Sequence, residues 1–270
     1  MKRVRAILAL LVVCTAGCNC EGRAVCTFLT SSTPTTGSAA GIWVGTDSAS
    51  GLQLTGFINV NGQADFIRSD GIQFVGTVQV SDTALEIALN GYTQYGYQFS
   101  DGSTFGTGTF SGTFSSGNTI SGSLQFTTDD NTAITSTWSL TFDSLYNTAS
   151  SVGTISGTYT DNLAAVSNGV DPLSGANVTI SSTGIMYGQG STDDCVLNGT
   201  VSDTDTSADL YEISYTYENC SGSAAVLNGV AFNGVAELNT TSSPEVVIIA
   251  VTGQSATGAD YGIVSDLSAG

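Results

Sequence analysis

The sequence predicts an all-β protein with two consecutive antiparallel β-meander barrels of about eight strands each, placed after a signal peptide and a short linker. Across residues 41–265, apolar residues alternate with small polar residues, which is the period of a strand with one buried face. Turn pairs such as Asp-Gly and Asn-Gly separate these runs, and no helix-length apolar pattern lies between them. Strands joined by short turns pair antiparallel, and a meander of this size protects its edges best by closing into a barrel.

Residues 1–17 have the pattern of an export signal. Three basic residues lie within the first five positions, and the apolar run Ala6–Val13 is too short to span a bilayer. Small residues stand directly before Cys18, as they do at a cleavage site. We therefore expect residues 1–17 to be removed during export.

The segment Thr15-Ala16-Gly17-Cys18 resembles the lipobox of bacterial lipoproteins, in which a cysteine after two small residues is acylated and becomes the first residue of the mature chain. Thr15 stands where that family prefers an aliphatic residue. The resemblance implies a lipid anchor at Cys18, carrying fatty acids such as palmitate. It also implies attachment to the outer membrane in the bacterial cell envelope. The resemblance does not distinguish the periplasmic side of that membrane from the surface side. The alternative is ordinary cleavage before a free Cys18.

Cysteine parity agrees with the anchor. Once the signal is removed, lipidation of Cys18 leaves four of the six cysteines, an even number that suits an oxidising compartment. Four cysteines allow three connectivities, and we expect the two local pairs, Cys20 with Cys26 and Cys195 with Cys220. In the chain-entropy model, closing the second of these loops adds about 3 to 4 kcal/mol to stability.

We expect four parts along the chain: the signal, an anchor and linker over 18–40, a first barrel over 41–146 and a second barrel over 152–268. The linker assignment rests on the Thr- and Ser-rich composition of residues 21–40, which show no periodic pattern.

A repeated order of short sequence motifs favours two similar halves of the chain. Gly41–Thr46 is followed by Gln73–Val78, and Gly153–Thr158 is followed by Val196–Val201, so that the order of Gly-Thr motifs repeats. Chance similarity in a Gly- and Thr-rich chain remains the alternative.

The clearest strand is Ile134–Phe142, in which apolar residues on one face alternate with Thr and Ser on the other. Leu52–Val60 has the same period, and Asn61-Gly62 then leads into Ala64–Ile67, which predicts a hairpin. Further turns are expected at Asp70-Gly71, Asp101-Gly102 and Gly117-Asn118, and a further inward face at Tyr211, Ile213, Tyr215 and Tyr217.

The tripeptide Gly41-Ile42-Trp43 resembles the G-x-W entry of lipocalin-like barrels, in which the Trp plugs one end of the barrel. The resemblance covers the first half, and the rest of the lipocalin pattern is absent. In layout, paired β-rich halves on a lipid anchor are similar to surface lipoproteins of the transferrin-binding-protein type. The inward aromatic residues of the first half form either a packed core or the lining of an apolar ligand cavity. The candidate lining residues are Trp43, Phe74, Phe110 and Trp138.

Charge excludes nucleic acid as a partner. Beyond position 20 the chain has 23 acidic residues and two basic ones, Arg23 and Arg68, which gives a net charge of −21. A surface of this sign repels phosphate backbones and anionic lipid headgroups.

Catalysis and metal binding have little basis in the sequence. The chain has no histidine, which removes the Ser-His-Asp and Cys-His arrangements and the most usual metal ligand. Glu212 and Glu218 share one face of a strand, but Ser214 and Thr216 on that face make it look solvated. We expect no catalytic residues, no metal and no cofactor.

These features favour a non-enzymatic, lipid-anchored envelope lipoprotein that acts as a binding or structural surface component. Its expected partners are the membrane, through the N-terminal lipid, and an unidentified protein or small apolar ligand. The alternative is a lipocalin-like carrier of a small apolar ligand. A transmembrane barrel is disfavoured, because the second strand face is rich in Thr and Ser and lacks the charges of an aqueous lumen.

Overall fold

The structure is a computed structural model, and its described residues belong to one compact unit that spans Pro34–Gly270. The signal peptide and the cysteines at 18, 20 and 26 lie outside the described residues, so the anchor and the first disulfide stay predictions. The described residues are 37–161, 170, 172–173, 175–190 and 193–270.

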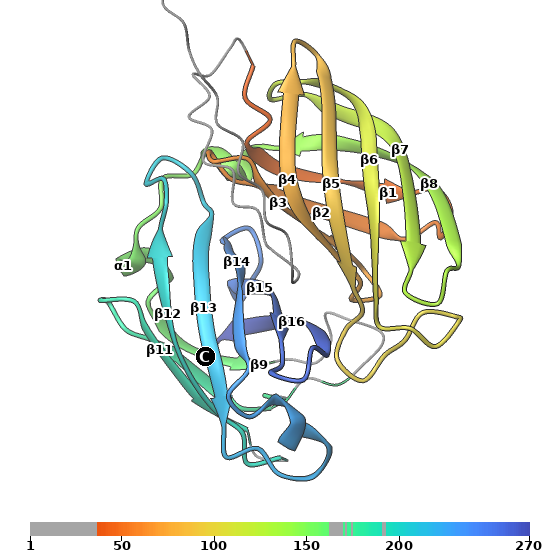
Figure 1. Cartoon of the computed structure of the whole chain (residues 1–270). Helices are drawn as coiled ribbons and strands as arrows, with labels where there is room; N and C mark the ends of the chain where they lie inside the picture. The colour runs from red at the N-terminus through yellow and green to blue at the C-terminus, as the bar shows by residue number, and fades with distance from the viewer. Residues whose placement is uncertain (1–36, 162–169, 171, 174, 191–192) are drawn as a thin grey trace, which may run out of the picture. The chain divides into compact units, whose positions relative to one another are not determined.

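The first barrel is a closed sheet of eight strands in sequence order (Figure 1). Each strand pairs antiparallel with the next, and β1 also pairs antiparallel with β8, with Trp43 opposite Phe142. The strands are β1 Gly41–Asp47, β2 Gln53–Ile58, β3 Gln63–Arg68, β4 Gln73–Ser81, β5 Ala84–Tyr92, β6 Phe105–Ser115, β7 Thr119–Thr128 and β8 Ala133–Asp143.

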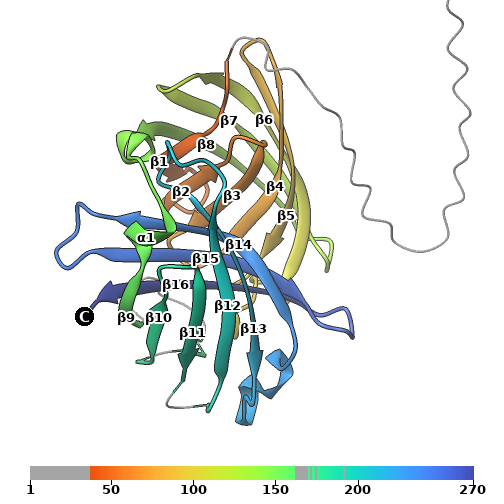
Figure 2. The same ribbon diagram turned by 90° about the vertical axis from the view of Figure 1, so that its left-hand side faces the viewer.

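The second barrel is closed in the same way, because β9 pairs with both β10 and β16. Figure 2 shows β9 to β13 following one another side by side. Its strands are β9 Gly157–Asp161, β10 Asn177–Ile180, β11 Ile185–Gln189, β12 Val196–Asp203, β13 Tyr211–Glu218, β14 Ala231–Asn239, β15 Val246–Gln254 and β16 Asp260–Ala269. The predicted all-β fold with two consecutive eight-stranded antiparallel barrels is confirmed.

Local sequence explains the strands and turns of the first barrel. In β8, Trp138 and Leu140 are buried while Thr137 and Ser139 are exposed, as the alternation predicts. The hairpin between β2 and β3 turns at Gly62, whose φ of 79° lies in the left-handed region that glycine adopts without strain. The other Asp-Gly and Gly-Asn turns of this barrel also lie between strands.

Aromatic rings fill the first barrel, and glycines make room for them. Gly91 of β5 and Gly106 of β6 are register partners, and a Cβ atom at either position would lie within 2.6 Å of the Phe126 ring. The ring therefore lies directly over the backbone of two strands, and neither position can accept a side chain without moving Phe126.

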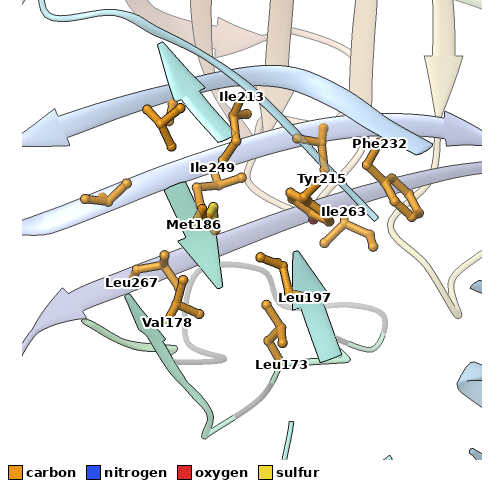
Figure 3. Close-up of a cluster of buried hydrophobic side chains, with 14 of the residues drawn as sticks. Leu173, Val178, Met186, Leu197, Ile213, Tyr215, Phe232, Ile249, Ile263 and Leu267 are labelled. Carbon is orange, nitrogen blue, oxygen red and sulfur yellow. The ribbon is translucent and has the colours of Figure 1, made fainter. Parts of the chain in front are cut away.

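The second barrel has a mixed core of aliphatic and tyrosine side chains, which point into its interior in Figure 3. The inward face predicted on β13 is confirmed, since Tyr211, Ile213, Tyr215 and Tyr217 are all buried. Phe232 of β14 packs against both Tyr215 and Tyr217.

Among the residues that the structure describes there are three short helical segments, η1 Ser144–Asn147, α1 Val152–Ile155 and η3 Gly222–Leu227. In the repeated motif Gly153–Thr158, the first three residues belong to α1 and the last two begin β9. Ser151 caps this helix by accepting a hydrogen bond from the Thr154 backbone N–H, which favours a helical turn locally.

The outer faces of the two barrels share a buried apolar cluster, which we call the interbarrel cluster. Burial of this apolar surface stabilises the contact between the sheets. Its buried members are Ile42, Phe57 and Ile67 from β1, β2 and β3, together with Leu210, Ala250 and Val264 from the second barrel.

Directional hydrogen bonds accompany the interbarrel cluster. The fully buried Gln94 side chain donates to the Val264 carbonyl at 3.4 Å and accepts from the Val264 N–H at 2.8 Å. The Tyr95 N–H donates to the Gly262 carbonyl at 2.8 Å. Because buried polar groups need their partners, these bonds fix how the segment after β5 meets β16.

The expected bridge between Cys195 and Cys220 is present, with Cα atoms 4.0 Å apart. Cys195 directly precedes β12 and Cys220 follows β13, so the disulfide ties the end of this hairpin. The Cys220 N–H also donates to the Asn228 side chain at 2.8 Å, which joins the bridge to the turn after η3.

We predict that the double substitution Cys195→Ala and Cys220→Ala lowers the free energy of unfolding by about 3 kcal/mol, because the bridge closes a loop with a sequence separation of 25 residues. Urea unfolding of the oxidised protein measures the change. Cys20→Ala with Cys26→Ala, which removes only the short bridge expected in the linker, serves as the control. A loss below about 1 kcal/mol, within the range of a single hydrogen bond, would contradict the stabilising role.

Candidate functional site

A cleft with several polar side chains in its walls lies where the outward faces of β3, β4 and β5 meet those of β12, β13 and β14. Its volume is about 500 Å³, within the range of small-molecule sites. Besides two carboxylates, its walls carry amide and hydroxyl groups, which include Asn59, Gln63, Asn90, Ser202, Ser214 and Asn233.

Asp65 of β3 is the buried carboxylate of this cleft. Its chain neighbours Ala64 and Phe66 belong to the core of the first barrel, so alternation directs Asp65 outward, toward the second barrel. Only 3% of Asp65 is exposed, and its Oδ1 atom has no hydrogen-bond partner. Its register partners are the apolar residues Phe57 and Val75. Burial therefore raises the pKa of Asp65 to about 8.

Glu212 of β13 supplies the second carboxylate, from the opposite wall. Tyr211 and Ile213 point into the second barrel, which turns Glu212 outward into the cleft. Glu212 is half-buried, and its register partners are Ser202 and Val235. The sequence pattern predicts a solvated strand face for Glu212. Glu212 is partly covered where the barrels meet, whereas Ser214 on the same face and Glu218 at the end of the strand are exposed.

A hydrogen-bonded turn shapes one rim of the cleft. The Asn59 side chain donates to Gln63 Oε1 at 3.0 Å, and its own oxygen accepts from the N–H groups of Asn61 and Gln63, also at 3.0 Å. The Asn59 side chain thus makes hydrogen bonds that backbone groups would otherwise make in this hairpin. The amide groups are held in place by the fold before any ligand arrives.

A second group of buried carboxyls lies on the outward face of the second barrel, centred on Glu237 of β14. Glu237 is 4% exposed, and burial together with the nearby Asp209, Asp143 and Asp266 raises its pKa to about 8. Burial also raises the pKa of both Asp209 and Asp266 to about 6. Ionisation of these carboxyls is therefore less favourable in the folded protein than in the unfolded chain.

The four candidate cavity residues of the first barrel are buried, and their aromatic contacts are close. The Trp138 ring stacks on Phe110 at 4.9 Å between centroids and contacts Phe74 at 5.4 Å. Trp43 donates its indole N–H to the Ala39 carbonyl at 3.0 Å, whereas the Trp138 indole N–H has no partner. Rings thus occupy the space around Trp138, and binding of an apolar ligand there stays a prediction.

Within the described part of the chain, no group of three or more Cys, Asp or Glu side chains is arranged to hold a metal ion. The helices of the same part are all too short to cross a bilayer.

Comparison with known proteins gave no match, either to a family model or to a curated protein sequence. The site must therefore be interpreted from its own geometry.

Sequence reasoning missed Asp65 as a site residue, although one signal was present. In Ala64–Ile67 a single acidic residue interrupts an apolar run, which is unusual for a strand unless the carboxyl has a specific environment. Asn59 and Asn233 gave no such signal, because Asn is common in turns and on wet strand faces.

We predict that the protein becomes less stable as the pH rises from about 4 to about 9, because the buried carboxyls bind protons more tightly in the folded state. A carboxyl whose pKa is higher in the folded than in the unfolded protein stabilises the fold fully at a pH below its unfolded pKa. This stabilisation is lost as the pH rises through the folded pKa, which is about 8 for Asp65 and Glu237. Thermal unfolding across this range measures the effect. Below about pH 4 the trend reverses, since Asp47 then loses its ion pair with Arg68.

Glu237→Gln is expected to raise the melting temperature at pH 9 by at least about 3 °C and to have little effect at pH 5. Glu86→Gln, which changes an exposed carboxyl on β5, is the matched control. Equal shifts for the two variants would show that net charge, rather than burial, produces the pH dependence.

Proposed function

We propose that this protein is a lipid-anchored lipoprotein of the cell envelope, held by Cys18, whose two-barrel body binds a small polar ligand in the cleft between the barrels. The linker over residues 21–40 then separates the body from the membrane surface. The single observation that carries the binding role is the buried Oδ1 atom of Asp65, which has no hydrogen-bond partner although the residue lines the cleft.

The energetics of Asp65 support a ligand. A buried polar atom without a partner destabilises the fold by about 1 to 3 kcal/mol. Replacing Asp65 by an apolar residue would remove this destabilisation without loss of packing, since both register neighbours of Asp65 are apolar. A binding role supplies the reason for retaining a carboxyl there, because a ligand donor would complete its hydrogen bonds.

The anchor is supported by the N-terminal sequence, in which Ala16 and Gly17 match the lipobox and Cys18 occupies the modified position. The disulfide between Cys195 and Cys220 agrees with an oxidising compartment outside the cytoplasm. By the same resemblance we propose the bacterial outer membrane as the site of attachment.

We also propose that the binding role is non-enzymatic. The chain has no histidine, which is the residue most often used as a general base near neutral pH. The amide and hydroxyl groups of the cleft serve recognition, since they exchange hydrogen bonds with a ligand without changing their own protonation.

Cys18→Ser is expected to abolish incorporation of an alkyne-labelled palmitate in a bacterial host and to move the protein from the membrane fraction to the soluble fraction. Cys14→Ser, within the expected signal peptide, should change neither. An unlabelled, soluble wild-type protein would overturn the proposed anchor.

Binding in the cleft is tested by native mass spectrometry of the full chain purified from membranes in detergent. We expect the wild-type protein to carry a small polar molecule at one copy per chain and Asp65→Asn to lose it. Glu218→Gln, which removes a carboxyl outside the cleft, should retain it. If wild type and Asp65→Asn carry the same bound species, the cleft is not the binding site.

A further inference from the structure

The charge balance inside the cleft points to the class of its ligand. Arg68 is the sole basic side chain among residues 37–161, 170, 172–173, 175–190 and 193–270. It is held by ion pairs with Asp47 at 3.2 Å and Asp70 at 2.8 Å. This part of the chain therefore offers no free cation to Asp65, and a cation that pairs with its ionised form would come from solution.

The two carboxylates lie on opposite walls, since Asp65 belongs to the first barrel and Glu212 to the second. One cationic group can pair with Asp65, and Glu212 then requires a second cationic group. A molecule with a charge at each end satisfies both carboxylates at once.

A metal ion fits this site poorly. Calcium takes six to eight oxygen ligands, whereas the carboxylates of the cleft are Asp65 and Glu212. The described residues include no group of three or more Cys, Asp or Glu side chains able to hold a metal ion. The volume of about 500 Å³ suits an organic molecule of modest size. The side-chain oxygens of Asn90, Ser214 and Asn233 are acceptors for additional N–H donors.

We propose that the cleft binds a small aliphatic diamine, with one ammonium group donating to the Asp65 carboxylate and the other to Glu212. This inference rests on the binding role proposed above and specifies its ligand. Charge-assisted hydrogen bonds of this kind are about twice as strong as neutral ones, and a buried carboxylate gains most from them. The acidic surface of the protein also raises the local concentration of cations around the opening of the cleft.

The test is isothermal titration calorimetry of the full chain in detergent with 1,4-diaminobutane, at physiological ionic strength so that loose attraction to the acidic surface is screened. We expect one molecule to bind per chain. Butylamine, which has the same length and a single ammonium group, should bind at least about tenfold more weakly.

The variants separate the cleft from general charge. Asp65→Asn should weaken binding at least about tenfold, and Glu212→Gln by about threefold to tenfold. Glu218→Gln lies on the same strand and face as Glu212 but outside the cleft, so it should leave the affinity unchanged within about twofold. Circular dichroism establishes that each variant is folded, and if Asp65→Asn does not fold, the comparison of Glu212→Gln with Glu218→Gln decides.

Equal affinities for the diamine and butylamine, or equal effects of Glu212→Gln and Glu218→Gln, would overturn the proposal. Absence of diamine binding would overturn it as well. If an Asp65-dependent bound species is nevertheless found by native mass spectrometry, the binding role stands and only the ligand class is wrong.

Discussion

Closure of each sheet by its first and last strands is the constraint on which the rest of this structure depends. Every other strand pairing within the barrels joins strands that follow one another in the sequence. The closing pairs are different, because β1 pairs with β8 and β9 pairs with β16. Closure removes the exposed edges that an eight-stranded meander would otherwise present. It also fixes the interior volume, so that Phe126 fits only because Gly91 and Gly106 have no side chains. Packing and closure therefore depend on each other.

Once both sheets are closed, the two barrels contact each other through faces that their strands direct away from the cores and through the segment after β5. Such faces are normally wet and polar, and here they are partly apolar, as Phe57 and Val264 show. The interbarrel cluster excludes water from groups that would otherwise be solvated, among them Asp65 and Glu237. The unusual protonation of these carboxyls is thus a property of the assembled pair of barrels, because it arises where one sheet covers the other.

Much of the fold can be predicted from the sequence, because alternation and turn chemistry act over a few residues. The pattern around Trp138 and the glycine at position 62 each specify local geometry regardless of what lies far away. The candidate site is different, since its walls come from outward faces that look solvated in the sequence. Glu212 beside Ser214 has the pattern of an ordinary wet face, and only the contact between barrels makes it part of a cleft. Local sequence patterns do not indicate which of the solvated strand faces packs against the other barrel.

The order of strand pairing has a consequence for how the chain reaches its destination. If the protein is exported from its N-terminus, the first barrel can close once β8 has crossed the membrane, whereas the second stays open until β16 follows. During that interval Ile42, Phe57 and Ile67 form an apolar patch on a finished barrel with nothing to cover it. An exported chain would then expose an apolar surface to its neighbours while half translocated, and a chaperone that covers this patch would be most needed before translocation ends.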